Sequence, residues 1–299
     1  MDFDTALLEE LGAFTKQLRK DISSRVVLGA SALSLIEYME DSINAKGYFP
    51  AFPATISVND VAAHFTVFDD DVILKKGDVV KVDFGVSKNG MITDNAFTVE
   101  IDTHNYDLLL KANREALDAV MQEVERGKSM HELGAVVWNV AHKYGFETIH
   151  NLSGHQVGPN KLHCGLSVPN YANSDMKRVE ENMELAIEPF LTLGSPKVKS
   201  GGNSNILHLL RVKPVRDPIA KKVLDYIKEH FSVLPFSKRW LLKMFDKQKV
   251  IYAVQILKKE GVLFEYEKLV TIDGAIVAQY EDTVLFAKGK KTILTRLEK

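Results

Sequence analysis

Apolar side chains in the first 47 residues recur with the spacing of a helix. They follow one another at steps of four and three, at Leu7, Leu11, Phe14, Leu18 and Ile22. This spacing places all of them on one face of a helix. A second helix is predicted between Ser31 and Gly47, because apolar residues again repeat at steps of three and four and glycine readily ends a helix. The chain is therefore expected to begin with two amphipathic helices.

A hairpin pattern follows these helices. Residues 49–57 read as a strand that two prolines interrupt. Residues 79–87 and 91–101 are rich in strand-forming side chains and flank an Asn-Gly pair, which is typical of a two-residue hairpin turn. These two strands are predicted to pair with each other.

The same order of elements then recurs along the chain. A helix is predicted over residues 107–125, and Ser129 with Glu132 has the form of a capping box at the start of the next helix. Strands are predicted at residues 148–152 and 184–190. Because helix, helix, strand and strand occur twice in this order, the sequence favours a duplicated α+β unit whose equivalent strands meet at a central cleft.

Residues 194–268 break this repeat and are interpreted as an insertion. Their first part, residues 194–205, is expected to form a loop, which is flexible at its glycine-rich residues 200–203. Three short helices and a strand follow in the manner of a winged helix, at residues 218–230, 238–246, 249–260 and 262–264. Strand patterns close the chain at residues 275–286 and 292–297. The chain thus divides into segments 1–193, 194–268 and 269–299, the first and last of which form one domain.

Composition narrows the class of protein. The chain has 299 residues, of which 45% are hydrophobic, enough for a sizeable buried core. Lys and Arg number 38 against 40 Asp and Glu, so bulk charge does not favour a nucleic-acid binder. The single cysteine excludes an internal disulfide and any zinc site built from several thiolates. No apolar run approaches the roughly 20 residues of a membrane helix and the N-terminus is acidic, so a cytoplasmic protein is expected.

Two carboxylates share one face of the predicted hairpin. A two-residue turn pairs Gly85 with Asp94 and Asp83 with Ala96, so Asp83 and Asp94 become diagonal neighbours, roughly 7–8 Å apart at the backbone. Both lie among apolar residues, and burial of an unpaired carboxylate costs several kcal/mol. Either one could instead face solvent at the end of the hairpin. If both are buried, they need a bound cation, a basic partner or a shared proton.

Glu188 and Glu281 repeat this situation, since each is the single carboxylate of an apolar stretch, at residues 185–190 and 276–281. No basic residue lies next to any of the four carboxylates in its own strand. The compensating charge must come from elsewhere, and two divalent cations would cancel four negative charges. A dinuclear site is therefore predicted, and its oxygen-rich ligands favour manganese, iron, cobalt or zinc over copper.

Histidines are the candidates to complete this site. His155 follows a predicted strand at a bend that Gly154 permits, and His64 and His163 are the two others. The residues alone leave open which of the three binds a metal, because a single histidine is more often a surface or hydrogen-bonded residue. Cys164 is interpreted as a buried small side chain, since adjacent residues of an extended segment point to opposite faces.

At these residues the chain resembles the type II methionine aminopeptidases over nearly its whole length. The matching motifs are PAFP at 50–53, SVNDVAAH at 57–64, VDFG at 82–85, TD at 93–94, NLSGH at 151–155, KLH at 161–163, IEPF at 187–190 and QYE at 279–281. The resemblance implies the family's pita-bread fold with a helical insertion. The family's five metal ligands fall on Asp83, Asp94, His155, Glu188 and Glu281.

The resemblance also implies an activity, the removal of an N-terminal methionine that precedes a small residue. Its catalytic residues map onto Glu188, which moves a proton, and onto His64 and His163, which hydrogen-bond the scissile amide. The methionine pocket maps onto Phe52, Leu162, His163 and Phe190. The implied substrates are nascent polypeptides, which places the enzyme near ribosomes. The implied enzyme is a cytoplasmic monomer that needs two divalent ions but neither a membrane nor a nucleic acid.

Two positions depart from the family pattern. Asp282 stands where the family usually has histidine, and Cys164 stands where alanine is usual. On an extended strand Asp282 is expected to face away from the metals, so the packing around the ligands should change without loss of activity.

Three other functions are less favoured by the sequence. A non-catalytic pita-bread homologue that binds protein or RNA is disfavoured because all five ligands are present. A proline-specific peptidase of the same fold is disfavoured by the motif that ends at His64 and by the position of the insertion. Nucleic-acid binding by the basic side chains of the insertion is less favoured than a solvated helix face; these are Lys221, Lys222, Lys238, Arg239, Lys243, Lys247 and Lys249.

Overall fold

A computed structural model describes residues 2–231 and 233–297. Residues 1, 232, 298 and 299 fall within the predicted segments 1–193, 194–268 and 269–299 and lie outside the described residues. Within the described ranges, no helix has both the length and the apolar character needed to cross a membrane.

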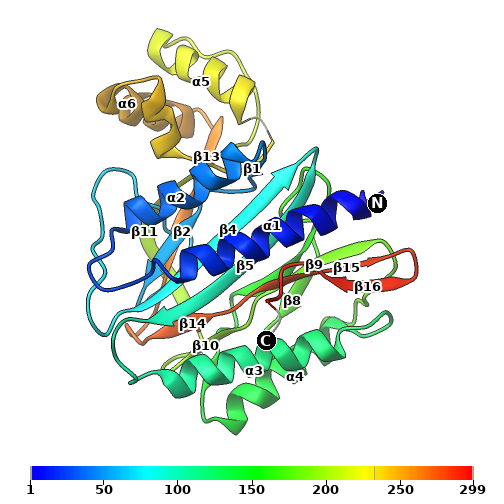
Figure 1. The fold of residues 1–299 in the computed structure, drawn as a ribbon. Coiled ribbons are helices and arrows are strands. Elements are labelled where there is room, and N and C mark those ends of the chain that lie inside the picture. The colour runs from blue at the N-terminus through cyan, green and yellow to red at the C-terminus, as the bar shows by residue number, and fades with distance from the viewer. Residues whose placement is uncertain (1, 232, 298–299) are drawn as a thin grey trace.

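The first half begins with the two predicted helices, α1 (Thr5–Ser23) and α2 (Ala32–Ala45). Asp4 and Ser31 cap them, each accepting a hydrogen bond from a backbone N–H of the first turn. The strands β1 (Phe49–Pro50), β2 (Thr55–Val58), β4 (Val79–Lys88) and β5 (Met91–Glu100) form one antiparallel sheet, with β5 on one side of β4 and both β1 and β2 on the other. Figure 1 shows α1 lying across this sheet, where its apolar face joins the main core.

The hairpin is formed in the predicted register. Asp83 pairs with Ala96 and Gly85 pairs with Asp94. The turn residues Asn89 and Gly90 both have positive φ, as a two-residue hairpin turn requires. The predicted strand at residues 49–57 is divided into β1 and β2, because prolines at 50 and 53 interrupt its hydrogen bonding.

The second half repeats the order of elements. Helices α3 (Asp107–Glu123) and α4 (Met130–Lys143) lie side by side below the sheets in Figure 1, and the capping box of Ser129 and Glu132 is present. The strands that follow are β6 (Glu147–Thr148), β7 (Ser153–Val157), β8 (Ser167–Pro169), β9 (Met183–Ile187) and β10 (Phe190–Thr192). The strand predicted at residues 148–152 is wrong in position, because most of that segment connects β6 to β7.

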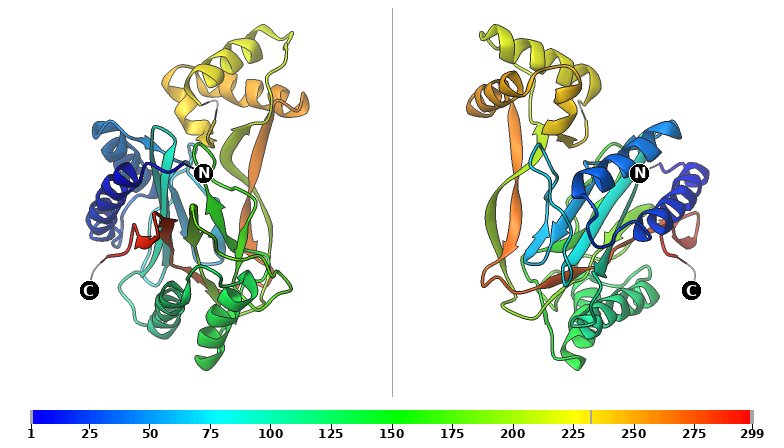
Figure 2. Two further views of the ribbon diagram at one scale, coloured as in Figure 1. Left: turned by 90° about the vertical axis from the view of Figure 1, so that its right-hand side faces the viewer. Right: turned by 60° about the vertical axis from the view of Figure 1, so that its left-hand side comes forward.

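The segment predicted as an insertion contains two long strands and a helical part. Its elements are β11 (Val198–Leu209), α5 (Pro218–His230), β12 (Phe236–Ser237), the 3-10 helix η1 (Lys238–Lys243), α6 (Lys247–Lys259) and β13 (Leu263–Thr271). Figure 2 shows the helices standing away from the rest of the molecule on the ribbon of β11 and β13. They enclose a core of their own, in which Leu224, Trp240 and Leu257 are buried.

The loop predicted at residues 194–205 is wrong, because most of it belongs to β11. This strand pairs with β13, whose other edge pairs with β3 (Val61–Ala63). The register shifts near Ser200 and Asn203, where the polar, glycine-rich sequence lacks the alternation of a regular strand. The helix predicted at residues 238–246 is instead the shorter 3-10 helix η1.

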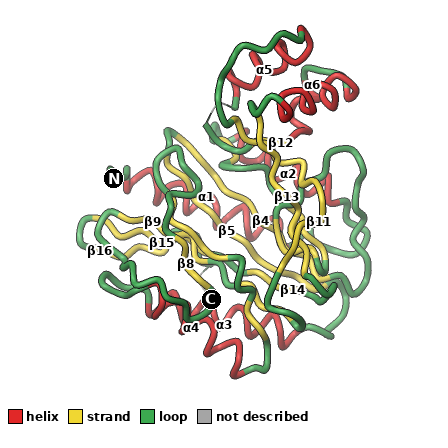
Figure 3. The backbone as a smooth tube through the Cα atoms, turned by 180° about the vertical axis from the view of Figure 1, so that it is seen from behind, coloured by secondary structure: helices red, strands yellow, loops and turns green. Residues whose placement is uncertain are grey.

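Two predicted strands are broken at their glutamates. Residues 184–190 divide into β9 and β10 around Glu188 and Pro189, and residues 275–286 divide into β14 (Val277–Gln279) and β15 (Asp282–Ala287) around Glu281. The last strand is β16 (Lys290–Ile293), and the sheet order is β16-β15-β9-β7-β8. Figure 3 shows β14 running toward this sheet below β11 and β13. Both breaks place a glutamate between two strands at the centre of the molecule.

Candidate active site

A cavity of about 370 Å³ is lined by side chains of both halves and of the insertion. It brings together every residue that the sequence assigns to the site, namely Phe52, His64, Asp83, Asp94, His155, Leu162, His163, Glu188, Phe190 and Glu281. These residues come from eight separate segments of the chain. Their convergence is a property of the fold, which the linear spacing alone does not show.

The hairpin and the segment before β15 position three of the carboxylates. Ala96 of β5 pairs with Asp83 on one side and forms an isolated bridge with Glu281 on the other. Asp94 lies two residues before Ala96, and its backbone exchanges hydrogen bonds with the Thr283 side chain of β15. Asp83, Asp94 and Glu281 are thereby held on three adjacent backbones.

The second half contributes the histidine and the remaining glutamate. His155 lies in β7 opposite Ala186 of β9, and a side chain at Gly154 would collide with the carbonyl oxygen of Ala186. Glycine is therefore required for the close approach that places the imidazole in the cavity. Glu188 follows β9, and its Oε2 accepts a hydrogen bond of 3.0 Å from Nε2 of Gln279.

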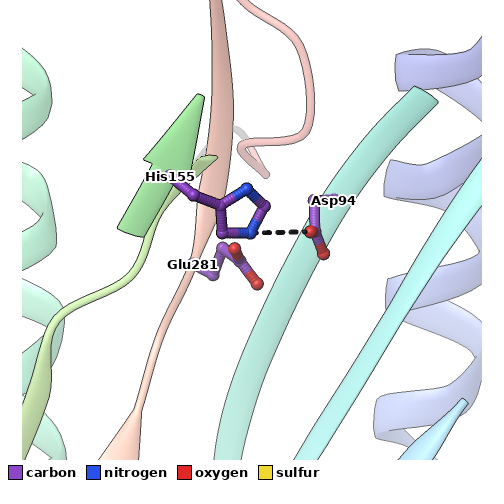
Figure 4. A group of neighbouring side chains, drawn as sticks. All are labelled: Asp94, His155 and Glu281. Carbon is purple, nitrogen blue, oxygen red and sulfur yellow. Dashed lines mark ion pairs between the residues drawn. The ribbon is translucent and has the colours of Figure 1, made fainter. Parts of the chain in front are cut away.

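Three of these side chains converge closely enough to share an ion. One ligand atom each of Asp94, His155 and Glu281 lies within 4.8 Å of the other two, and Nε2 of His155 is 3.5 Å from Oδ2 of Asp94. Figure 4 shows the imidazole pointing at the Asp94 carboxylate, with Glu281 beside both. Oδ1 of Asp83, Oδ1 of Asp94 and Oε1 of Glu281 are buried and accept no hydrogen bond from the part of the chain that the structure describes. Buried oxygens without hydrogen-bond donors suit a cation.

The electrostatics of the carboxylates support the same conclusion. Burial raises the pKa of Asp83 to about 7. Burial, and after it repulsion between the carboxylates, raises the pKa of Asp94, Glu188 and Glu281 well above their usual range. The protein alone thus offers this cluster too little positive charge, and the oxygen-rich donor set with one imidazole fits divalent metal ions.

His64 and His163 line the cavity beside this cluster. Burial, and after it the nearby His163, lowers the pKa of His64 to about 4, and burial lowers the pKa of His163. Both imidazoles are therefore neutral at pH 7 and have one N–H to donate and one nitrogen to accept. The rings of His163 and His155 are in edge contact, with centroids 4.2 Å apart.

Tyr266 is a cavity residue that the sequence analysis missed. It lies on β13 with its ring edge-on to His64, the ring centroids being 5.6 Å apart. The predicted strand of the insertion ended at Phe264, although strand-forming residues continue to Thr271. That pattern would extend the predicted strand through Tyr266. It would not show that Tyr266 lies at the cavity.

An apolar part of the cavity adjoins the carboxylates. Phe52 and Phe190 are almost fully buried there, and Leu162 is half-buried. Gly85 is required beside Phe52, because a Cβ at this position would clash with the Phe52 ring and with the Ala51 side chain. These side chains leave an apolar recess beside the cluster that could hold a flexible thioether.

The two unusual residues lie outside the cavity lining. Asp282 is buried and its Oδ1 is 2.9 Å from Nη1 of Arg19 in α1, while Thr295 donates a hydrogen bond to the same oxygen. Cys164 is only half-buried, and its thiol lies 3.6 Å from the carbonyl oxygen of Lys161. The burial predicted for Cys164 is therefore wrong in degree, because the segment around it lies at the surface.

Comparison with known proteins agrees with this geometry. The model of metallopeptidase family M24 matches residues 6–224. A methionine aminopeptidase of Archaeoglobus fulgidus is 39% identical over 290 residues, which cover 97% of each chain. Among solved structures, a thermophilic Arx1 aligns with a TM-score of 0.84 at 17% identity, covering 98% of this chain and 91% of its own. The methionine aminopeptidase of Rickettsia prowazekii aligns with a TM-score of 0.70 at 18% identity, covering 98% and 97%.

These similarities confirm the predicted α+β pita-bread fold. The alignment with the Archaeoglobus fulgidus relative covers nearly the whole chain. Sequence identity above 30% across both chains also confirms the resemblance on which the site was assigned. This chain belongs to the methionine aminopeptidases of metallopeptidase family M24.

Proposed function

We propose that the protein removes the N-terminal methionine from polypeptides whose second residue is small, with two divalent ions held by Asp83, Asp94, His155, Glu188 and Glu281. The observation that carries this proposal is the cluster of buried carboxylates with raised pKa values beside an apolar recess. When bound, the ions would supply Lewis acidity and a water molecule of lowered pKa.

Glu188 is proposed to move the proton in this reaction. Its side chain is half-buried at the cavity, and its Oε2 is held by the Gln279 amide, so the other oxygen is free to take a proton and to give it to the leaving amine. Burial, and after it repulsion from Asp83 and Asp94, raises the pKa of Glu188, which supports a role in proton transfer.

His64 and His163 are proposed to bind the scissile amide. Each is neutral near pH 7 and can donate one hydrogen bond toward the carbonyl oxygen as negative charge develops on it. Phe52, Leu162 and Phe190 are proposed to hold the methionine side chain, since all three line the apolar recess next to these histidines.

The specificity is tested with a pair of peptides. Purified protein loaded with manganese or cobalt should release methionine from Met-Ala-Ser and leave Met-Lys-Ser intact, because the implied site accepts only a small second residue. Metal analysis of the same sample should give two ions per chain. Equal cleavage of both peptides would refute the specificity, and cleavage of an Ala-Pro dipeptide bond with the methionine peptide untouched would favour the proline-specific alternative.

The cellular setting follows from the substrate class. Nascent chains carry the N-terminal methionine, so we propose a cytoplasmic enzyme that works close to ribosomes, as a monomer with no membrane or nucleic acid required. Size-exclusion chromatography with light scattering at micromolar concentration tests the monomer, which has a calculated mass of 33.5 kDa.

A further inference from the structure

A fully buried lysine lies next to the carboxylate cluster. Lys81 is in the middle of β4, two residues before Asp83 and on the same face of the strand. Its side chain has no solvent exposure and does not line the cavity. A buried lysine is rare unless it is paired, so its partners need an explanation.

The partners of Lys81 are backbone carbonyl oxygens. Its Nζ donates to the carbonyl oxygen of Asn59 at 2.7 Å, to that of Val277 at 3.0 Å and to that of Val79 at 3.4 Å. Three acceptors match the three N–H groups of an ammonium, whereas a neutral amine has only two. Burial lowers the pKa of Lys81 to about 7, and the charges of Asp60 and Asp78 oppose this by favouring the charged form.

The three carbonyls belong to the segments that lead to the site. Asn59 has a positive φ of 57° and lies in the turn between β2 and β3, five residues before His64. Val79 begins the strand that carries Asp83, and Val277 begins the strand that leads to Glu281. The backbone of Asn59 joins the other two segments directly, since its N–H donates to the carbonyl oxygen of Val79 at 2.8 Å and its carbonyl oxygen accepts from the N–H of Val277 at 3.4 Å. The ammonium adds a donor that the carbonyl oxygens of all three residues share.

The strand of Val277 has a second link to the site. Gln279, two residues further along β14, donates to Glu188, and its carbonyl oxygen accepts from Thr98 of β5. A displacement of β14 would therefore move two of the carboxylates together. Without the ammonium, these three carbonyl oxygens would lose their shared donor at a buried position, which weakens the attachment of the segments to one another.

We propose that the ammonium of Lys81 is a positioning residue of the metal centre, an internal cation that holds the segments bearing His64, Asp83 and Glu281 in the arrangement that binds the ions. Lys81 touches neither substrate nor ions and acts through the backbone. The inference rests on the metal site of the proposed function. Groups that orient metal ligands typically change metal affinity 10-fold to 100-fold when they are removed.

The first test is the affinity for Mn²⁺, measured by calorimetry on the full-length protein. Lys81→Met keeps most of the side-chain length but removes the charge and the donors, and it should weaken Mn²⁺ binding about 10-fold to 100-fold. Val86→Ala is the matched control, because Val86 is fully buried in the same strand and outside the site. The control should lower thermal stability while leaving Mn²⁺ affinity within about twofold of wild type, since a structural defect alone does not reach the ligands.

The second test is chemical rescue. Lys81→Ala lacks the three methylenes and the amine that propylammonium supplies, so millimolar propylammonium should restore Mn²⁺ affinity, whereas propanol of the same size should not. Wild-type affinity in Lys81→Met, or rescue no better with propylammonium than with propanol, would overturn the positioning role. A wild-type protein that binds no Mn²⁺ would overturn the proposed function as well, so the two failures are distinguishable.

Discussion

The buried ion pair of Arg19 and Asp282 gives the sharpest prediction on stability. The side chains are 10% and 4% exposed, and Nη1 of Arg19 lies 2.9 Å from Oδ1 of Asp282. Burial raises the pKa of Asp282 even though Arg19 opposes this, so the cost of removing the carboxylate from water exceeds the attraction within the pair. Removing one partner should therefore be far more costly than removing both.

The magnitudes differ between the two single substitutions. Asp282→Asn leaves the Arg19 guanidinium buried with a 3.4 Å contact to the Glu281 carbonyl oxygen, and arginine cannot lose its charge, so a loss of about 3–5 kcal/mol in the free energy of unfolding is expected. Arg19→Met leaves Asp282, which can take up a proton and keep the hydrogen bond from Thr295. The cost of Arg19→Met should therefore be smaller and should shrink further as the pH falls.

The sign of this pH dependence follows from linkage. Without Arg19, the pKa of Asp282 in the folded protein lies further above its unfolded value of 3.8. The folded state then binds more protons than the unfolded state, so stability decreases as the pH rises from 4 through the folded pKa. Arg19→Met should be closer to wild type at pH 5 than at pH 8.

Urea unfolding of the metal-free protein measures these differences. Arg126→Met is the matched control, because it breaks the exposed pair of Arg126 and Glu181, and it should cost no more than about 1 kcal/mol. The double variant Arg19→Met/Asp282→Leu should lose much less free energy of unfolding than the sum of the losses in the two single variants. Single variants that both cost less than about 1 kcal/mol, or a double variant that costs the sum of the two, would refute the reasoning.

Three further predictions concern the site. Glu188→Gln should abolish turnover of Met-Ala-Ser while peptide binding persists, because an amide cannot move the proton. Chromatography of the released methionine measures the turnover, and a near-normal rate would contradict the role of Glu188. His64→Ala should lower kcat by ~10²-fold or more with metal content unchanged by elemental analysis, whereas lost metal would make His64 a ligand. The raised pKa values of Asp94, Glu188 and Glu281 favour their protonated forms in the metal-free protein, so Mn²⁺ must displace protons and its affinity should rise from pH 6 to pH 8. Calorimetry in two buffers of different ionisation enthalpy measures the released protons. A pH-independent affinity would argue against the cluster.

The placement of Asp83 and Asp94 on one face of the hairpin could be predicted because the argument required only local information. The register of the hairpin follows from its two-residue turn, which makes neighbours of Asp83 and Asp94, and the absence of adjacent bases predicted a need for cations. The choice of His155 among three histidines could not be made this way, because His155, His64 and His163 all line the same cavity. That choice came from the resemblance.

What the sequence did not predict depends on contacts between distant segments. β11 lacks apolar alternation in its glycine-rich part, where its register shifts, so this part reads as a loop in the sequence. Its partner β13 lies some sixty residues further along the chain. Glu188 and Glu281 lie at strand ends, where Pro189 cannot donate to a ladder and Glu281 bridges to Ala96 instead.

Lys81 shows the same limit at a single residue. Alternation in β4 places its side chain on the face of Asp83, but this spacing does not say which groups its Nζ contacts. In the structure its Nζ donates to three backbone carbonyl oxygens. One belongs to Val79 of β4 itself, and the other two belong to Asn59 and Val277, which lie outside β4. Backbone acceptors carry no sequence signal, so only the folded arrangement reveals them.

The most direct test of the account is a crystal of the wild-type protein grown with excess manganese, with anomalous diffraction recorded to locate the metal. We expect two manganese peaks within the cavity, both in contact with side chains of the set Asp83, Asp94, His155, Glu188 and Glu281. A map in which these carboxylates carry no peak and are separated from one another would contradict it.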